Sequence, residues 1–420
     1  MRILKENGLF IVVTLTCFLL YILRFEHGHI TIDLSSHLNY FRFQADAFLQ
    51  GHLNLGDTPS REDLVQYNHL YYIYWPPVPA LVYMPLVSVF GNQLPDAFIN
   101  SLFATLNVWS IMKIISIVNR HYNCSLKTQH VAMLGLFWGL GTVHFYMARE
   151  GTVWYVSQIM AQSFLLLAIY CFMAIQKKYT RLLIAGFFFA CAAYTRNHFV
   201  LTLPFFIAIE WSKEAKFNVK KFVFQNWIFI LPFLCFSLAN AWYNYARFGN
   251  YFENGLKYHL MSDFFSNVFK KFGYFSLHYF PHNLYTEVFH WPTLTSVFPF
   301  INRDPEGFGF MWGSPFYFLI IPALFLWFKN KNDKHEIARF AMVKGSMLSA
   351  FLMAVIIFSI MGTGWVQFCA RYTLDFQFFL VLILVLMWPF VSKIKLIKPI
   401  ALILILLSVI IQSIGAQYLI

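Results

Sequence analysis

Charged residues are scarce in this sequence. Asp, Glu, Lys and Arg together make up 12% of the 420 residues, whereas hydrophobic residues make up 59% and aromatic residues 20%. The mean hydropathy is +0.57. A soluble globular domain carries about twice this share of charged residues. The composition therefore excludes that class and indicates a protein that crosses a membrane several times.

Several chemical motifs are also missing. The six cysteines show no spacing typical of a disulfide framework or a zinc site, so we interpret them as small core residues. No glycine-rich loop of the Walker or dinucleotide-binding type opens a helix anywhere in the chain. The sequence therefore offers no support for a nucleotide-sugar donor that is used in the cytoplasm.

The sequence does contain a series of apolar runs, and an apolar helix needs about 20 residues to cross a bilayer core. The short loops between the runs carry clusters of Lys and Arg, and we place all of these clusters in the cytoplasm. This bias explains the net charge of +12 without a nucleic-acid partner. The predicted spans are 8–25, 95–118, 131–148, 153–175, 182–195, 198–211, 223–245, 314–328, 339–361, 373–391 and 399–417.

This arrangement predicts eleven crossings, with the amino terminus inside and the carboxyl terminus outside. The two long loops, residues 26–94 and 246–313, then lie on the outer side. One apolar segment, residues 77–90, does not fit, because a crossing there would move the following lysine clusters to the wrong side. We interpret it as a short re-entrant or surface helix on the outer face, and the alternative is a twelfth span.

The acidic residues favour the outer side. Of the 19 Asp and Glu residues, five lie in inner segments and 14 lie outside or at the outer membrane edge. Acidic residues contribute little to orientation, so the outer face has another use for carboxylates. No charged residue stands near the middle of a predicted span, where ion-coupled transporters place one, and this counts against transport.

The first outer loop contains a predicted helix. The segment from His37 to Gly51 has apolar residues at helical spacing and ends at a glycine, which indicates a helix lying in the membrane interface. Asp33 stands just before it, so its carboxylate could either do chemistry or cap the helix. His27, His29 and His37 stand near Asp33, and a divalent metal is conceivable there. Because they form no tight ligand motif, we expect no metal and no cofactor.

Six short motifs follow one another along the chain. The first outer loop contains ADAFLQG at 45–51 and an aromatic-Pro-Pro-x-Pro turn at 75–79. Downstream stand YTRNHFVLTLP at 194–204, ARFGNYFENGLKY at 246–258, DPEGFGFMWGSP at 304–315 and GWVQFCARYTLDF at 364–376. In this order, the sequence resembles the GT-C superfamily of membrane glycosyltransferases. It is most similar to an uncharacterised bacterial branch related to protein O-mannosyltransferases and the lipid A aminoarabinose transferase.

The resemblance implies an architecture. GT-C proteins of this kind have a seven-helix module followed by a large outer loop, and the seventh predicted span here leads directly into residues 246–313. We therefore expect an all-α polytopic membrane protein of about 11 transmembrane helices, whose two long outer loops carry interfacial helices. Its regions are a GT-C-like module at 1–245 that includes the loop 26–94, the second loop at 246–313, and a four-helix membrane region at 314–420.

The resemblance also implies an activity, the transfer of a sugar from a polyprenyl-phosphate donor to an acceptor hydroxyl, with inversion at the anomeric carbon. Such an enzyme must deprotonate the acceptor and stabilise the departing phosphate. Asp33 resembles the early-loop base of the family, but relatives often carry a second acid where this chain has His37. The candidate bases, in order, are Asp33, His37, Asp46 and Asp63.

Cations on the outer side are the candidates for holding the phosphate. Arg196 lies in an outer turn, where the positive-inside bias disfavours it, and Arg371 precedes the tenth span. Arg247 and Lys257 begin the second outer loop. We favour Arg196 and Arg371, because arginine binds phosphate in a bidentate manner. The structural alternative for Arg196 is snorkelling to lipid headgroups.

Two other classes of function stay open. A lipid or glycolipid transporter would need a polar path to the cytoplasm, and a membrane scaffold could have lost the active site, as the missing acidic pair allows. For the transferase, we expect a cell-envelope enzyme in the lipid bilayer, with the bacterial inner membrane as the default location and an active site on the outer side. The sequence does not distinguish a glycan, lipid or protein acceptor.

Overall fold

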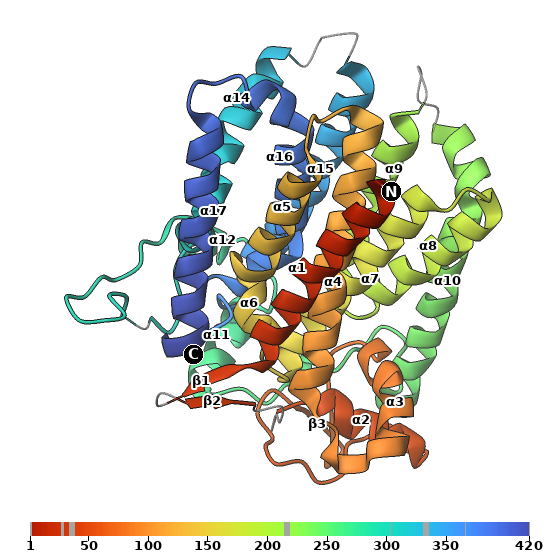
Figure 1. Ribbon diagram of the computed structural model, residues 1–420. Coiled ribbons are helices and arrows are strands. Elements are labelled where there is room, and N and C mark those ends of the chain that lie inside the picture. The colour runs from red at the N-terminus through yellow and green to blue at the C-terminus, as the bar shows by residue number, and fades with distance from the viewer. Residues whose placement is uncertain are drawn as a thin grey trace.

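The computed structural model describes residues 2–26, 29–32, 38–213, 219–302, 304–330, 336–365 and 367–419. It is a bundle of long helices that run alternately up and down, with short helices and two small hairpins at one end (Figure 1). The helices of the bundle are α1 (Arg2–Ile22), α4 (Asp96–Tyr122), α5 (Thr128–Leu140), α6 (His144–Ala148), α7 (Val153–Ala174), α8 (Lys178–Ala193), α9 (Leu203–Trp211), α10 (Val219–Phe248), α14 (Ile320–Asn330), α15 (Ile337–Phe358), α16 (Leu374–Val391) and α17 (Ile397–Ile414).

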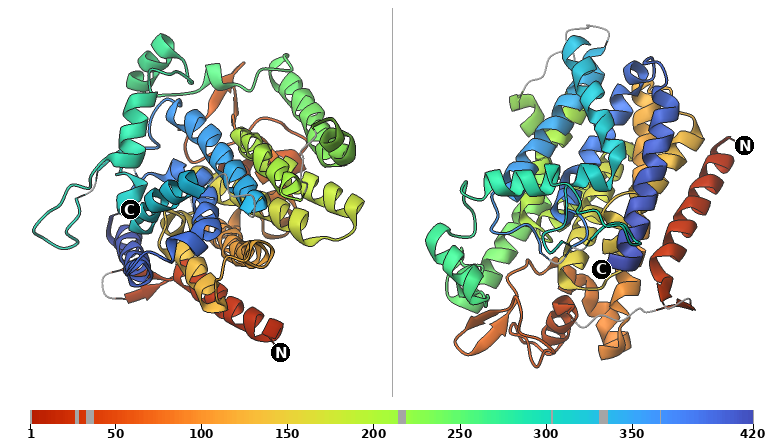
Figure 2. Two further views of the ribbon diagram at one scale, coloured as in Figure 1. Left: turned by 90° about the horizontal axis from the view of Figure 1, so that it is seen from above. Right: turned by 90° about the vertical axis from the view of Figure 1, so that its left-hand side faces the viewer.

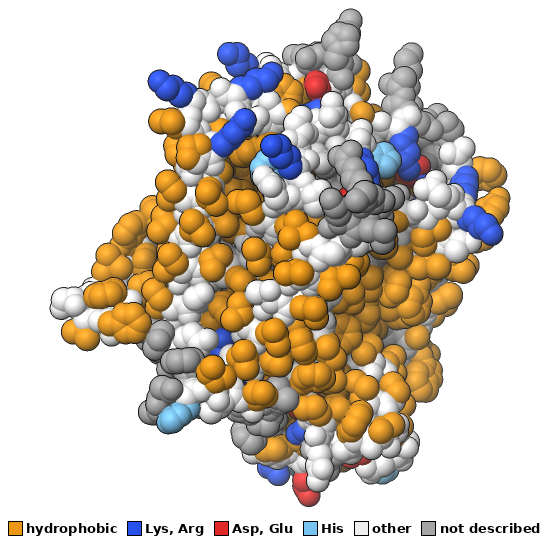
Figure 3. All heavy atoms as spheres, in the orientation of Figure 1, with side chains coloured by type: hydrophobic (Ala, Val, Ile, Leu, Met, Phe, Trp, Pro, Cys, Tyr) orange, Lys and Arg blue, Asp and Glu red, His pale blue; other side chains and the backbone are white. Residues whose placement is uncertain are grey.

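The two ends of the bundle differ in charge. Most of the visible Lys and Arg side chains gather at the upper end in Figure 3, above a broad apolar belt. We call this the lysine-rich end; it includes the α4–α5 and α16–α17 connections. The opposite end, which carries both long loops, is the loop end. The amino terminus lies toward the former and the carboxyl terminus toward the latter (Figure 1). This distribution agrees with the topology expected from the positive-inside rule.

Each of the eleven predicted spans contains a helix in the structure. Six described helical stretches are long and apolar enough to cross a membrane, and they begin at residues 96, 153, 223, 337, 371 and 397. The other helices of the bundle are shorter or less apolar. The membrane character of the protein follows from these helices, while the number of eleven crossings stays a prediction.

Three predicted spans are not regular helices. The span predicted at 131–148 is divided into α5 and α6 at Gly141, whose backbone nitrogen still bonds to Phe137. A Cβ on Gly141 would lie 3.0 Å from Phe137 and 3.3 Å from Ser408, so the chain bends where it is closely packed. The spans at 198–211 and 314–328 each begin with a 3-10 turn, at Asn197–Thr202 and Pro315–Leu319.

The first outer loop folds at the loop end. It contains the hairpin of β1 (Arg24–Glu26) and β2 (His29–Thr31), and the hairpin of β3 (Val65–Tyr67) and β4 (Leu70–Tyr72). Helix α2 (Tyr40–Leu49) confirms the helix predicted there, but its N-cap is Asn39, so Asn39 does the capping that we considered for Asp33. Gly51 follows it with a φ of 78°, which suits glycine at a helix end.

Helix α3 (Val78–Phe90) is the apolar segment that did not fit the predicted topology. Its 13 residues span about 20 Å, less than the roughly 30 Å of a bilayer core. It packs beside α2 at the loop end (Figure 1). This placement agrees with the surface or re-entrant interpretation. The second outer loop adds α11 (Asp263–Phe272), α12 (Phe280–Leu284) and the short α13 (Phe310–Gly313).

Helix α10 leads from the bundle into the second outer loop and has α8 as its main packing partner. The view from above places α10 at one edge of the bundle and α1 at another (Figure 2). Glycine permits the close approach of the two helices, because a Cβ on Gly186 of α8 would lie 2.2 Å from the backbone oxygen of Phe229 in α10. The position of the second outer loop therefore depends on this contact.

We predict that Gly186→Ala lowers the thermal stability of the detergent-solubilised protein, because the added methyl group must push α8 and α10 apart. Overpacking of this kind costs about 1–3 kcal/mol. Thermal unfolding followed by tryptophan fluorescence measures the effect. Gly8→Ala in α1 is the matched control, since a Cβ there meets nothing within 4 Å. Equal melting temperatures for the two variants would contradict the prediction.

Candidate functional site

The two outer loops join each other by backbone pairing beside a carboxylate. The backbone nitrogen of Leu260 donates to the carbonyl oxygen of Leu64 at 2.8 Å, and Val65 pairs with His259 as an antiparallel bridge. This pairing brings Asp63 of the first loop next to His259 of the second. One of the sequence-predicted carboxylates therefore stands where the two loops meet.

Asp63 has both carboxylate oxygens engaged. Trp154, at the start of α7, donates its indole N–H to Oδ2 at 2.8 Å, and Nε2 of His259 lies 3.1 Å from Oδ1. The side chain of Asp63 keeps 30% exposure, whereas that of His259 keeps 6%. Asp63 also has a φ of 58°, a left-handed conformation that costs energy for most residues but less for Asp. Asp63 is thus held in one orientation by contacts with two other segments of the chain.

Asp63 lines a cavity of about 380 Å³ at the loop end. Its walls come from the first outer loop, the start of α7, the second outer loop and residues 361–372. Most of the lining side chains are aromatic or polar. They include Tyr74, Tyr155, His259, Tyr274, Trp365, Arg371 and Tyr372. Burial raises the pKa of Tyr74 and Tyr274, so both phenols stay protonated at neutral pH.

Arg371 supplies the positive charge of this cavity. Its Nε and Nη2 atoms donate to the carbonyl oxygen of Gly364 at 3.2 and 2.7 Å. The guanidinium carbon lies 5.3 Å from the ring centre of Tyr155 and 4.9 Å from that of Tyr372. Nη1 is buried and has no hydrogen-bond partner among the described residues. The guanidinium is therefore fixed in place with part of its donor capacity unused.

A buried ion pair lies behind the cavity. Nη2 of Arg196 is 2.9 Å from Oδ2 of Asp375, and Nε2 of His198 is 2.8 Å from the same oxygen. Gln158 of α7 donates to Oδ1 of Asp375 and to the backbone oxygen of Arg371, both at 3.1 Å. Asp375 thereby ties the α8–α9 turn, α7 and the beginning of α16 together. The guanidinium of Arg196 reaches the cavity wall through Tyr372, at 5.8 Å from its ring centre.

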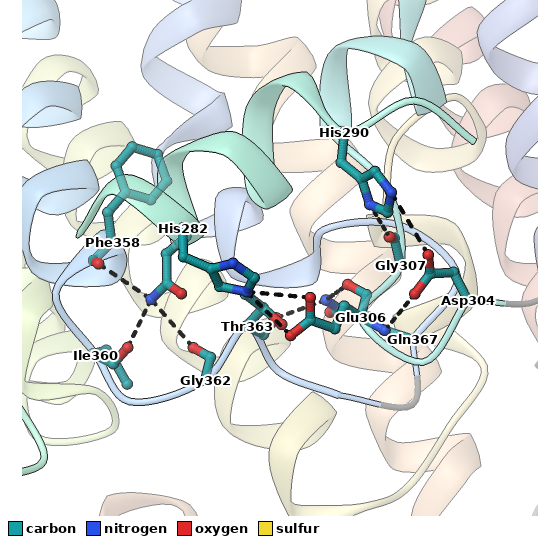
Figure 4. Close-up of polar contacts among 11 residues, drawn as sticks. His282, His290, Asp304, Glu306, Gly307, Phe358, Ile360, Gly362, Thr363 and Gln367 are labelled. Carbon is teal, nitrogen blue, oxygen red and sulfur yellow. Dashed lines mark hydrogen bonds and ion pairs between the residues drawn. The ribbon is translucent and has the colours of Figure 1, made fainter. Parts of the chain in front are cut away.

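The second outer loop contacts the segment 358–367, which leads to Arg371 (Figure 4). Gln367 donates to the carbonyl oxygens of Glu306 and Thr363 at 2.7 and 2.6 Å (Figure 4). Its side-chain oxygen accepts from the backbone nitrogen of Arg371 at 3.1 Å. Asn283 of α12 donates to three carbonyl oxygens, those of residues 358, 360 and 362. These bonds position the Arg371 backbone from outside the bundle.

Two histidine–carboxylate contacts brace the same loop. His282 lies 3.2 Å from a carboxylate oxygen of Glu306, and Nε2 of His290 lies 3.7 Å from Asp304 (Figure 4). His290 also contacts the backbone oxygen of Gly307 through Nδ1 at 3.0 Å. The segment 304–307 is therefore held by His282 and His290, in addition to its hydrogen bond with Gln367.

Glu287, just after α12, is a buried carboxyl group without a hydrogen-bond partner among the described residues. Burial raises its pKa well above the usual range, and the charge of Arg371 opposes the rise. A protonated carboxyl is the form that such an apolar site favours. Burial of Glu287 thus favours its protonated form, and the electrostatic influence of Arg371 favours the carboxylate.

The structure brings some of the predicted site residues together and separates others. Asp63 and Arg371 line the same cavity, and Arg196 lies directly behind it. Asp46 of α2 does not line this cavity, and its carboxylate accepts a hydrogen bond from Gln50 at 2.9 Å. Asp33 and His37 lie outside the described residues, so their predicted roles stay predictions.

The remaining two cations do not line the cavity. Arg247 is buried, donates to the backbone oxygen of Ile73 and to Asn244, and stacks 3.8 Å above Tyr243. Through these contacts, Arg247 connects α10 to the first outer loop. Lys257 is exposed, and its ammonium lies 2.6 Å from Glu253, which raises the pKa of the lysine. Neither cation is placed to meet a ligand bound beside Asp63.

Sequence reasoning missed His259, Trp154, Asp375 and Glu287. His259 and Trp154 carried no local signal, because they meet Asp63 only through the folding of three distant segments. Asp375 stands at the start of a predicted span, four residues after Arg371. An ion pair between this carboxylate and an arginine on the same side of the membrane could have been inferred from the sequence. Within the described part of the chain, no three His, Cys, Asp or Glu side chains are grouped as metal ligands would be; His27 and His37 fall outside that part.

Comparisons with known proteins identify the fold. No protein-family model and no curated protein matches the sequence. The solved structures of the oligosaccharyltransferase from Archaeoglobus fulgidus superpose on nearly the whole chain at 10% sequence identity. The apo form gives a TM-score of 0.56 over 97% of this chain and 56% of that chain. The form tethered to an acceptor peptide gives 0.55 over 99% and 55%.

The archaeal enzyme is a GT-C glycosyltransferase, so this chain has a GT-C-like fold. At 10% identity the likeness concerns the fold alone, and this fold is the one that the sequence resemblance implies. It does not support the O-mannosyltransferase or aminoarabinose transferase branch in particular. This chain spans about half the length of the archaeal protein.

We predict that Glu287→Gln stabilises the protein increasingly as pH rises. The folded-state pKa of Glu287 is raised, so the folded protein keeps this proton more tightly than the unfolded chain. The wild type is therefore fully stable at this site below the unfolded pKa and loses stability as pH rises toward the folded value. Glutamine cannot ionise, and we expect a gain of about 1–3 kcal/mol at pH 8 relative to pH 4.

Melting temperatures of both proteins in detergent from pH 4 to 8 measure this effect. Glu62→Gln is the control, because Glu62 is exposed at the cavity edge. A variant that is less stable than the wild type at every pH would show that the carboxylate form of Glu287 is needed.

Proposed function

We propose that this protein is a glycosyltransferase that moves a sugar from a polyprenyl-phosphate donor to an acceptor hydroxyl on the outer face of the membrane. The observation that supports it is the cavity at the loop end of a GT-C-like bundle. Asp63, a carboxylate, and Arg371, a guanidinium, both line this cavity. These are the two kinds of group that the transfer needs.

The reaction needs a base near the acceptor. The donor sugar already carries a good leaving group, the lipid phosphate, so the enzyme must mainly remove the proton of the attacking hydroxyl. Among the candidate bases we propose Asp63 for this role, because it lines the cavity and its contacts with Trp154 and His259 fix its orientation. Asp33 remains the first candidate from the sequence, so both carboxylates are included in the test.

The reaction also needs a cation for the departing phosphate. Arg371 faces the cavity with a guanidinium held by Gly364, and preorganised donors stabilise developing negative charge most effectively. Arg196 is paired with Asp375 behind Tyr372, so in this proposal it positions the segment of Arg371 and does not contact the phosphate. Attack from the face opposite the phosphate inverts the anomeric carbon.

The aromatic lining suits a sugar. Tyr155 and Trp365 offer flat apolar faces, and the protonated phenols of Tyr74 and Tyr274 can donate to sugar hydroxyls. The solved relative binds an acceptor peptide. Because this chain spans about half of that protein, the acceptor class here stays open between glycan, lipid and protein.

We predict that purified wild type consumes one member of a panel of polyprenyl-phosphate sugars. Asp63→Asn should bind that donor with unchanged affinity and reduce turnover 100-fold or more, as about 10²–10⁴ is typical for loss of general-base catalysis. Arg371→Gln should weaken both donor binding and turnover. Asp33→Asn tests the alternative base. Mass spectrometry of released polyprenyl phosphate and donor binding by microscale thermophoresis are the two measurements.

Asp57→Asn and Arg61→Lys are the matched controls, because both residues are exposed in the same loop and lie outside the cavity lining. Full activity of Asp63→Asn with loss in Asp33→Asn would assign the base to Asp33. Donor binding by none of these proteins would contradict the transferase and favour the transporter or scaffold alternatives.

We also predict that the activity needs no divalent metal, because the proposed steps use only a carboxylate and guanidinium groups. Turnover after dialysis against EDTA should equal turnover before dialysis. A loss that added Mn²⁺ or Mg²⁺ restores would show a metal site and would direct attention to the histidines around residue 33.

A further inference from the structure

A second cavity lies at the lysine-rich end, at the other end of the bundle from Asp63 and Arg371. Its volume is about 530 Å³. It opens between the start of α5, the last two turns of α16 and the first two turns of α17, which neighbour one another in Figure 1. The proposed transfer reaction uses none of its residues.

The mouth of this cavity is cationic. Lys127, just before α5, and Lys398, in the first turn of α17, both belong to its lining, together with Ser125 and Ser392. The lining contains no Asp or Glu. Within the described part of the chain, neither lysine has an acidic partner, whereas Lys257 and Lys213 elsewhere do. Two cations therefore line one cavity without an acidic counter-ion among the described residues.

His130 adds a neutral donor to the mouth. Its Nδ1 atom accepts the backbone N–H of Lys127 at 3.2 Å. An imidazole nitrogen that accepts a hydrogen bond carries no proton, so the proton of the neutral ring lies on Nε2. That N–H has no described acceptor in the protein and belongs to a ring that lines the cavity. The mouth thus offers two ammonium groups and an imidazole N–H.

The depth of the cavity is apolar. Along α16 the lining runs from Ser392 to Leu384, and eight residues of helix correspond to about 12 Å. The inner part is lined by Leu134, Phe316, Val385 and Ile405. A free inorganic anion would fill only the mouth. The shape instead matches a molecule with an anionic head and a hydrocarbon tail.

The side of the cavity faces the surface of the bundle. Leu402 of α17 belongs to the lining and is 44% exposed. It lies within a stretch that is apolar enough to cross a membrane. A lipid in the adjacent leaflet can therefore reach the cavity laterally without leaving the hydrocarbon layer.

We propose that this cavity binds one anionic phospholipid from the leaflet at the lysine-rich end, with its phosphate between Lys127 and Lys398 and one acyl chain between α5, α16 and α17. Basic pockets between transmembrane helices bind anionic headgroups in this way. The bound lipid joins the α16–α17 hairpin to α5. The site does not depend on the proposed transfer activity.

The test uses delipidated full-length protein in nanodiscs or mild detergent, titrated with phosphatidylglycerol. Binding is measured by native mass spectrometry and by the rise in melting temperature. Each lysine near an anionic lipid contributes about fivefold in affinity. The double variant Lys127→Gln/Lys398→Gln should therefore bind phosphatidylglycerol about 25-fold more weakly. Ala401→Phe, which keeps every charge and fills the apolar part, should weaken binding as well.

Lys393→Gln/Lys395→Gln is the matched control, because it removes the same charge from the same end at residues outside the cavity lining. It should bind phosphatidylglycerol like the wild type. Equal weakening in the two double variants would overturn the proposal and show diffuse surface attraction. Equal stabilisation by phosphatidylcholine, or by glycerol phosphate without acyl chains, would overturn it too.

Discussion

The packing at the loop end of this bundle depends on one buried carboxylate, Asp375. Its side chain has no exposure, and it meets Arg196, His198 and Gln158 from two other segments of the chain. In a low-dielectric interior, removing one member of such a pair costs about 3–5 kcal/mol, because the other charge is left unpaired. The pair therefore fixes the α8–α9 turn against α16. The position of Arg371, four residues before Asp375, depends on this arrangement.

The two outer loops contact each other and the segment before Arg371, and they complete the walls of the cavity. Asp63 and His259 stand 196 residues apart in sequence and meet because the backbones at Leu64 and Leu260 are hydrogen-bonded. The second loop reaches Arg371 through Gln367 and Asn283. A carboxylate from one loop and a guanidinium at the head of a helix thus line one cavity. The GT-C-like bundle therefore supports a cavity to which both long loops contribute lining residues.

Much of the fold could be predicted from the sequence. The apolar runs and lysine clusters place the helices, since the bilayer constrains both length and charge. Arg371 was predicted as a ligand because an outer arginine contradicts the usual bias, and it does line the cavity. Arg247 drew the same prediction, yet it bonds to the backbone of Ile73, a contact that no local pattern reveals. Asp63 was ranked fourth among the candidate bases, and its partner His259 was not predicted. The reason is the same, because only the tertiary pairing of the two loops creates this contact.

The most direct measurement is an electron cryomicroscopy structure of the full chain with a non-hydrolysable polyprenyl-phosphate sugar. We expect the phosphate in contact with Arg371, the sugar against the aromatic wall beside Asp63, and the polyprenyl chain leaving toward the bilayer. Ligand density at another place, or none at saturating concentration, would contradict the assignment of this cavity as the transfer site.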